Sequence, residues 1–153
     1  MFGIILTVIA QLFGPQVDDP AARKVNDMPQ LQSTLKEASS CKKGEVKLTF
    51  ELRSSVKQKI LIWQSPLEKP LTADCLEVRD KNGKAVEYKG ISAKRGEPSD
   101  TDYITLEADK PVSETFDLAS EYELKPGKYT VRFKGNMDVN KLPDSNVLTV
   151  DVR

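Results

Sequence analysis

The sequence predicts an all-β fold, an immunoglobulin-like antiparallel β-sandwich of about seven to nine strands. Two observations lead to this prediction. From residue 31 onward, apolar and polar residues alternate in short runs, which is the period of a strand with one buried face. Turn residues close each run before the next one begins. We therefore expect many short strands and almost no helix.

The first two runs of the domain illustrate the pattern. In residues 30–38, Leu31 and Leu35 are spaced as on a helix, but Thr34 and the serine pair that follows favour a strand and its exit. The run 46–52 places four apolar side chains on one face and polar side chains on the other. Both segments are interpreted as strands.

The middle of the chain adds a strand and a hairpin. Residues 59–63 are apolar on both faces, which predicts a central strand. Asn82-Gly83 separates the runs 76–78 and 86–88, and this dipeptide favours a type I′ hairpin turn. Further strands are expected in residues 103–108, 112–118, 128–134 and 147–152.

Length and charge narrow the choice of partners. The 153 residues suit one domain with its own hydrophobic core. Lys and Arg together number 23, as do Asp and Glu, so the formal net charge is zero. Because no positive charge is left over to attract a phosphate backbone, we expect no nucleic-acid partner. We also expect the domain to be a monomer.

The chain contains no histidine. Histidine is the usual general base near neutral pH and the commonest zinc ligand, so its absence excludes Ser-His-Asp and Cys-His catalysis and an HExxH zinc site. Two cysteines are too few for a zinc site made of cysteines alone. We therefore expect no enzyme activity, no metal and no cofactor.

The N-terminal segment predicts export from the cytoplasm. Residues 1–14 carry no charge and contain an apolar run as long as the core of a signal peptide, too short to span a bilayer. A buried first strand is the alternative, since no Lys or Arg precedes the run. Residues 15–30 contain three prolines and are interpreted as a linker. The domain proper is expected over residues 31–153, in a secreted or periplasmic protein without a membrane partner beyond the export segment.

The two cysteines, Cys41 and Cys75, precede the strands predicted at 46–52 and 76–78. In an exported protein of this size, two cysteines usually pair, and such a disulfide would stabilise the domain by about 3–4 kcal/mol. The alternative is a thiol offered to the zinc of a partner. The disulfide is the favoured prediction.

A series of loop and turn motifs between Gly44 and Phe133 suggests a family. In order, they are Leu61-Ile62-Trp63-Gln64-Ser65-Pro66-Leu67-Glu68, Gly83-Lys84-Ala85-Val86-Glu87-Tyr88-Lys89-Gly90, Lys94-Arg95-Gly96-Glu97-Pro98, Asp102-Tyr103-Ile104 and Pro126-Gly127-Lys128-Tyr129. This series resembles the N-terminal β-sandwich domain that precedes the catalytic domain in deuterolysin-like (aspzincin) and peptidyl-Lys zinc metallopeptidases. Ser65 and Lys69 depart from that family's W-x-T-P-L-E-G stretch, which has Thr and Gly there.

The resemblance implies a free-standing copy of a prodomain-like module, since the chain has no histidine to hold the catalytic zinc. It predicts a non-catalytic binding domain that acts as an inhibitor or prodomain-like partner of a secreted zinc metallopeptidase. The competing hypothesis is an adhesion or structural module of the cell envelope or surface, because sandwiches are common scaffolds for such proteins.

Two loops are the candidate partner-binding sites. Each also has a plain structural interpretation: the first as a crossover between sheets, the second as a solvated loop. The candidate residues are Ser65, Pro66, Leu67 and Glu68 in the first loop and Lys94, Arg95 and Glu97 in the second.

The large aromatic residues are assigned to packing. Trp63 is expected in the core between the two sheets, as in other sandwiches. Each tyrosine can bury its ring while its hydroxyl group anchors a turn. The tyrosines are Tyr88, Tyr103, Tyr122 and Tyr129.

Overall fold

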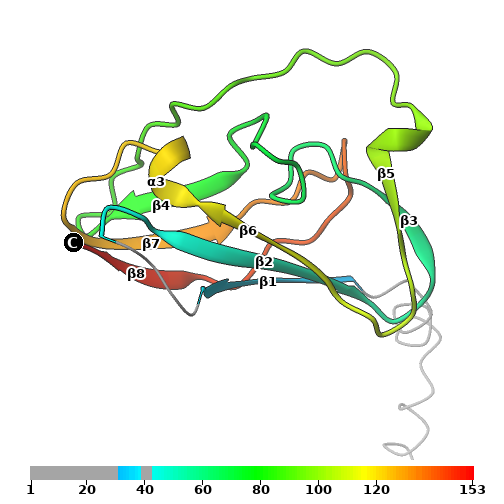
Figure 1. Cartoon of the computed structure of the whole chain (residues 1–153), viewed down its shortest axis with the longest axis horizontal. Helices are drawn as coiled ribbons and strands as arrows, with labels where there is room; N and C mark the ends of the chain where they lie inside the picture. Colours follow the sequence, from blue (N-terminus) through cyan, green and yellow to red (C-terminus); the bar gives the residue numbers. More distant parts are fainter. Residues whose placement is uncertain (1–30, 39–42) are drawn as a thin grey trace, which may run out of the picture. The chain divides into compact units, whose positions relative to one another are not determined.

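The computed structural model describes residues 31–38 and 43–153. The predicted export segment, the predicted linker and Cys41 lie outside the described residues. Over the described part the chain forms eight antiparallel strands, so the all-β prediction is confirmed (Figure 1). The elements are β1 (Leu31–Glu37), β2 (Lys47–Ser54), β3 (Gln58–Leu61), β4 (Leu76–Asp80), η2 (Asp100–Asp102, a 3₁₀ turn), β5 (Tyr103–Leu106), β6 (Val112–Asp117), α3 (Leu118–Glu121), β7 (Gly127–Phe133) and β8 (Leu148–Val152).

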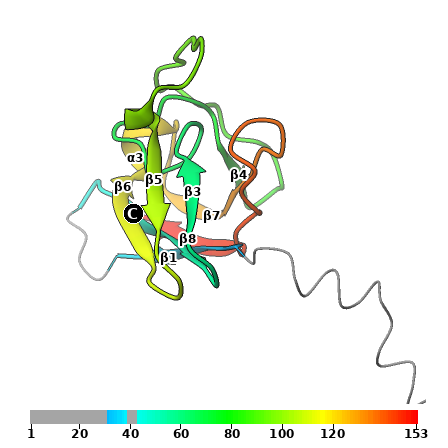
Figure 2. The ribbon, with the colours of Figure 1, turned by 90° about the vertical axis from the view of Figure 1, so that its right-hand side faces the viewer.

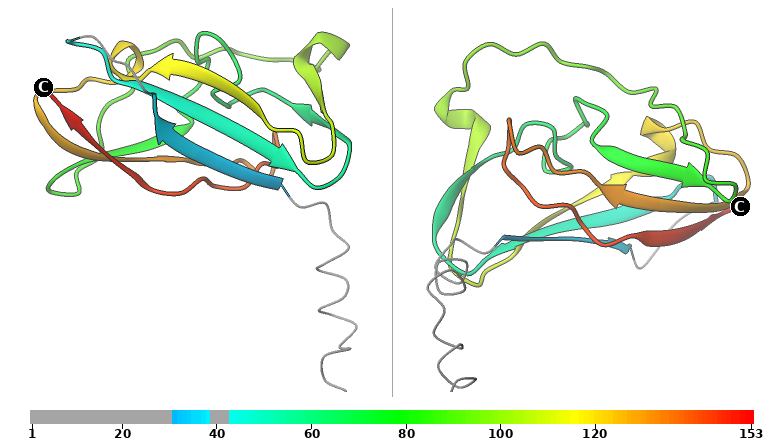
Figure 3. Two further views of the ribbon diagram at one scale, coloured as in Figure 1. Left: turned by 60° about the horizontal axis from the view of Figure 1, so that its bottom comes forward. Right: turned by 180° about the vertical axis from the view of Figure 1, so that it is seen from behind.

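Two three-stranded sheets form the sandwich. One has the order β1-β2-β6 and the other the order β4-β7-β8, and they lie in separate layers (Figures 1 and 3). Their inner faces meet where the rings of Phe50 and Phe133 pack edge to face, with centroids 4.9 Å apart. A two-stranded ribbon of β3 and β5 stands at one end of the sandwich (Figure 2).

Strand β2 shows how the alternating pattern builds the core. Leu48, Phe50 and Leu52 are fully buried on its inner face. On the outer face, Thr49 hydrogen-bonds Thr115 of β6 at 3.0 Å. Burial of three large apolar side chains stabilises the fold by about 1.5–3 kcal/mol each, which fixes the register of this central strand between β1 and β6.

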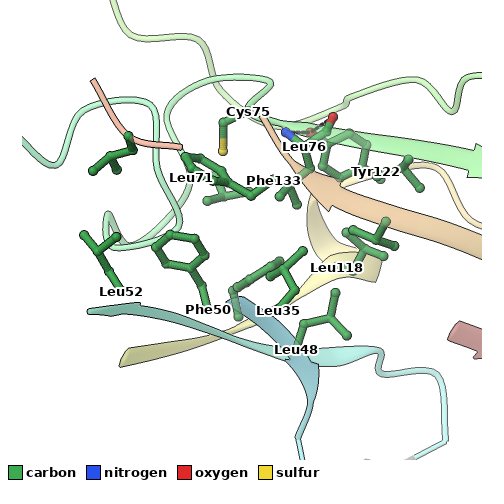
Figure 4. Close-up of a cluster of buried hydrophobic side chains, with 14 of the residues drawn as sticks. Leu35, Leu48, Phe50, Leu52, Leu71, Cys75, Leu76, Leu118, Tyr122 and Phe133 are labelled. Carbon is green, nitrogen blue, oxygen red and sulfur yellow. Dashed lines mark hydrogen bonds between the residues drawn. The ribbon is translucent and has the colours of Figure 1, made fainter. Parts of the chain in front are cut away.

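The core is one continuous cluster between the sheets (Figure 4). Leu71 and Leu142 belong to this cluster, although both lie in loops outside the strands. Each is at most 2% exposed. The loops that contain them are therefore fastened to the sandwich by buried leucines, and this limits how far they can move.

Two tyrosines bury their rings and form hydrogen bonds through their hydroxyl groups, as predicted. Tyr129, near the start of β7, accepts a hydrogen bond from the Lys125 N–H at 2.8 Å and donates one to the Lys125 carbonyl at 2.9 Å. This arrangement is the tyrosine corner of immunoglobulin-like sandwiches. Tyr122 is fully buried, and its hydroxyl donates to Asp74 Oδ1 at 2.5 Å, while burial raises its pKa. Tyr103 does not have the buried ring that was predicted for it, because it is 37% exposed.

The prediction of a central strand at residues 59–63 is wrong. Strand β3 ends at Leu61 and pairs with β5 on one side, in a ribbon outside both three-stranded sheets. Gln64 follows with a φ of 57°, a left-handed conformation that ends the extended backbone. Trp63 is buried at 8% exposure but is not part of the main apolar cluster between the sheets.

The predicted type I′ turn is also wrong. Gly83 has a φ of 82°, but Asn82 does not have the positive φ that a type I′ turn requires. Instead, the carboxylate of Asp80 accepts hydrogen bonds from the N–H groups of Asn82 and Lys84, at 2.8 and 3.0 Å. A side-chain acceptor thus directs the turn, and the residues after it form isolated bridges and no strand.

Candidate partner-binding loops

The two candidate loops meet in the structure. Arg95 Nη2 donates to Glu68 Oε2 at 2.5 Å, which joins the segment after β3 to the long connection that precedes η2. Arg95 also donates to Thr72 Oγ1 at 3.0 Å, and its other terminal nitrogen lies 3.9 Å from Asp102 Oδ1. We call this group, together with Trp63, the Arg95 cluster. It makes one surface from segments 27 residues apart in sequence.

Glu68 holds the first loop closed. Its Oε1 accepts hydrogen bonds from the backbone N–H of Gln64 at 3.1 Å and from the Thr72 hydroxyl at 2.6 Å. Its Oε2 accepts from Arg95, and the side chain is only 10% exposed. Both carboxylate oxygens are therefore occupied within the domain. This arrangement suits a structural anchor better than a ligand for an external metal.

Arg95 covers the indole of Trp63. The guanidinium carbon lies 4.9 Å from the ring centroid, within the range of a cation–π contact. Because the Arg95 side chain is 27% exposed, it forms the outer layer and Trp63 the inner layer of this end of the domain. The stacked pair explains how Trp63 is buried without entering the main core.

Asp102 closes the cluster from η2. The backbone N–H of Ser99 donates to Asp102 Oδ2 at 2.8 Å, and the Ser99 hydroxyl donates to the same oxygen at 3.2 Å. The pKa of Asp102 is lowered, chiefly by the Ser99 backbone hydrogen bond, because a hydrogen bond to the carboxylate favours its charged form. Asp102 therefore stays negative beside Arg95 across the neutral pH range.

Not all predicted residues of the first loop reach the surface. Ser65 is 1% exposed; its hydroxyl donates to the Ile62 carbonyl at 2.7 Å, while the Leu67 N–H is 3.3 Å from Ser65 Oγ. Pro66 is buried as well, and Leu67 is partly buried against the core. These three residues shape the loop from inside, and Glu68 is the one that connects it to the second loop.

The second loop is the exposed half of the site. Lys94 and Glu97 are exposed and belong to a connection that has no regular secondary structure from residue 91 to 99. This connection crosses one side of the molecule between β4 and η2 (Figure 1). It is held in place by Arg95 and by a hydrogen bond from the Ala93 N–H to the Thr72 carbonyl at 2.9 Å. Lys94 and Glu97 thus project from an anchored backbone.

A third loop also supports the Arg95 cluster, although its role was not predicted from the sequence. Asn140 is 4% exposed, and its side-chain amide donates to the carbonyls of Trp63 at 2.8 Å and Gln64 at 3.2 Å. Asn136 donates to Gln64 Oε1 at 3.1 Å. Two asparagines four residues apart, at either end of a short loop segment, were the available signal, since Asn side chains often bond loop backbone.

The expected disulfide is not found. Cys75 is a free thiol, 5% exposed, and its sulfur points into the apolar cluster in Figure 4. Burial raises its pKa to about 12. A thiol in this position packs as a small apolar side chain, so it is also poorly placed to bind a partner's zinc. Its proposed partner, Cys41, lies outside the described residues.

In residues 31–38 and 43–153, no group of three or more Cys, Asp or Glu residues is arranged to hold a metal ion. Within the same ranges, no helix has the length and apolar character needed to cross a bilayer.

The geometry therefore gives an anchored, two-loop surface. The buried members of the candidate set fix its shape, and Lys94, Arg95 and Glu97 form its outer side.

Comparison of the sequence with models of known protein families and with curated proteins finds no match.

Proposed function

We propose that this domain is a non-catalytic, extracytoplasmic binding module that docks onto a secreted zinc metallopeptidase and blocks its cleft. The observation that supports the proposal most is the Arg95–Glu68 pair. It joins the two loops that the family resemblance selected into a single surface. A surface that is already ordered loses little conformational entropy on docking.

The cluster favours steric exclusion over capture of the enzyme's zinc. Both oxygens of Glu68 are engaged inside the domain, and the thiol of Cys75 is buried. Lys94 and Glu97 remain exposed, with opposite charges on one short segment. In a peptidase that accepts lysine, Lys94 is the natural contact for an acidic subsite. Occupying the cleft with this loop would inhibit without a metal ligand.

The exposed surface gives less support to the adhesion alternative. Adhesion would be favoured by a basic face rich in exposed aromatic side chains. Among the described residues, Tyr103 is the one aromatic that is substantially exposed, at 37%. The remaining large exposed apolar residues are the scattered aliphatic or sulfur-containing side chains Val56, Ile91, Met137 and Val147.

The test is inhibition measured against a panel of secreted zinc metallopeptidases, including enzymes that cleave beside lysine. The full chain should inhibit at least one of them at a molar ratio near one. Lys94→Ala should weaken this inhibition by about tenfold at unchanged melting temperature, since a few contacts dominate an interface. Lys84→Ala, in the exposed turn after β4, is the matched control and should inhibit like the unaltered chain. Absence of inhibition across the panel would contradict the proposal.

A further inference from the structure

Lys94 is an exposed lysine between two anchored residues. Ala93, before it, donates its backbone N–H to the Thr72 carbonyl at 2.9 Å. Arg95, after it, donates from its guanidinium to Thr72 Oγ1 at 3.0 Å and to the Glu68 carboxylate. Both neighbours of Lys94 are therefore bonded to the same residue, Thr72, and the backbone between them is held on each side.

The segment around Lys94 is extended. Residues 91–96 contain no turn or bend, and they belong to the connection that crosses one side of the domain (Figure 1). Successive side chains of an extended chain point to opposite sides. Because the Arg95 side chain points inward over Trp63, the Lys94 side chain points away from the domain.

The peptide groups of Lys94 are open to a partner. Among the residues that the structure describes, none hydrogen-bonds the Lys94 N–H or carbonyl, and none pairs with its ammonium group. A peptidase binds its substrate as an extended segment, through main-chain hydrogen bonds and a subsite that reads one side chain. An exposed lysine with free peptide groups in an extended segment has the form of such a substrate.

We propose that the segment at Lys94 enters a peptidase cleft as a substrate would, with Lys94 in a subsite that selects lysine, and that the domain retains the segment after the Lys94–Arg95 bond is cut. This mode of binding rests on the proposed function, because it takes the occupant of the surface to be a peptidase. The cut consumes one water molecule. The Lys94 carbonyl carbon becomes a carboxylate, the C–N bond breaks, and the Arg95 nitrogen leaves as an ammonium group.

Both ends made by the cut remain close together. The new carboxylate, on Lys94, is one residue from the bond between Ala93 and Thr72. The new ammonium group is on Arg95, whose side chain stays bonded to Glu68 and Thr72. Groups held in this way react with each other much faster than free peptides do. The peptidase therefore re-forms the bond, with release of water, and its cleft stays occupied.

The test treats the full chain, under native conditions, with a catalytic amount of a peptidase that cleaves only after lysine. Of the lysines in residues 46–153, Lys94 should be cut first and at least about tenfold faster than any other, since its segment needs no local unfolding before it is cut. The cut chain, purified and returned to the same peptidase, should re-form intact chain to at least about a tenth of the total. A first cut at another lysine of this range, or no re-formed chain, would overturn the inference.

Two conservative variants test the anchor. Glu68→Gln weakens the bond to Arg95 without altering the segment that the peptidase reads, so re-formation of the Lys94–Arg95 bond should fall at least about tenfold. Glu51→Gln, which removes the ion pair with Lys36 between β1 and β2, is the matched control and should re-form the bond like the unaltered chain. Equal re-formation in the two variants would contradict the anchoring role of Glu68.

Failure here is distinguishable from failure of the proposed function. A domain that inhibits a zinc metallopeptidase but never re-forms the Lys94–Arg95 bond would overturn this inference alone. A domain that inhibits no zinc metallopeptidase but is cut first at Lys94 and re-forms the bond would support the inference, and would overturn only the class of peptidase that the proposed function names.

Discussion

Replacing Arg95 with alanine tests how the two loops are joined. The substitution removes the ion pair with Glu68, the hydrogen bond to Thr72 and the cation–π contact with Trp63. The ion pair is only partly shielded, since the two side chains are 27% and 10% exposed, so we assign it about 1 kcal/mol. The cation–π contact adds about 0.5–1 kcal/mol. We expect Arg95→Ala to lower the free energy of unfolding by about 2 kcal/mol.

A double-mutant cycle with Glu68→Gln isolates the pair from the other effects. The coupling free energy between positions 68 and 95 should be about 1 kcal/mol. The control cycle uses Lys36→Ala and Glu51→Gln, an ion pair at 3.0 Å whose side chains are 55% and 28% exposed. Because that pair is better solvated, its coupling should stay below about 0.5 kcal/mol.

The assay is urea unfolding followed by circular dichroism and by the fluorescence of Trp63, the chain's one tryptophan. Trp63 lies under Arg95, so its emission in the folded state should also shift to longer wavelength in Arg95→Ala as the ring gains contact with water. A coupling of 68 with 95 no larger than that of the control pair would refute the reasoning, because the loops would then be held together by something else.

Three further predictions concern the frame that supports the loops. Tyr129→Phe keeps the ring but loses two backbone hydrogen bonds, so it should cost about 1–3 kcal/mol in urea unfolding; a loss below about 0.5 kcal/mol would contradict the tyrosine corner. Gly135→Ala should destabilise by at least about 2 kcal/mol, because its Cβ would lie 1.7 Å from the Leu142 carbonyl oxygen, whereas Gly96→Ala meets no atom within 4 Å and should be nearly neutral; equal melting temperatures would contradict this. Cys75 should resist iodoacetamide at pH 8 in the folded chain and react after denaturation without reductant, and rapid labelling of the folded chain would argue against its burial.

The strands could be predicted from the sequence because each contains its own signal. The alternating runs of β2 and β7 place every second side chain in the core, and a shift of one residue would expose them all. The prediction failed where contacts between segments far apart in sequence determine the place of a strand. Residues 59–63 look like a central strand, but their place in a two-stranded ribbon depends on pairing with β5, which lies more than 40 residues away.

The candidate site was predictable in part. The resemblance selected the loops that contain Glu68 and Arg95, and the structure brings these two residues together. It could not show that Ser65 faces inward, since a small polar side chain that bonds its own loop backbone looks the same in sequence as one on the surface. Nor did it identify Asn140, whose role depends on a contact 77 residues away.

The most direct test of the central claim is a hydrogen-exchange footprint on the complex with a peptidase that the domain inhibits. The claim is that the loops joined by Arg95 and Glu68 form the docking surface. Backbone amides in residues 64–72 and 91–100 should exchange more slowly in the complex, and those of the turn at residues 80–84 should not change. A footprint that leaves both loops unchanged would contradict the claim.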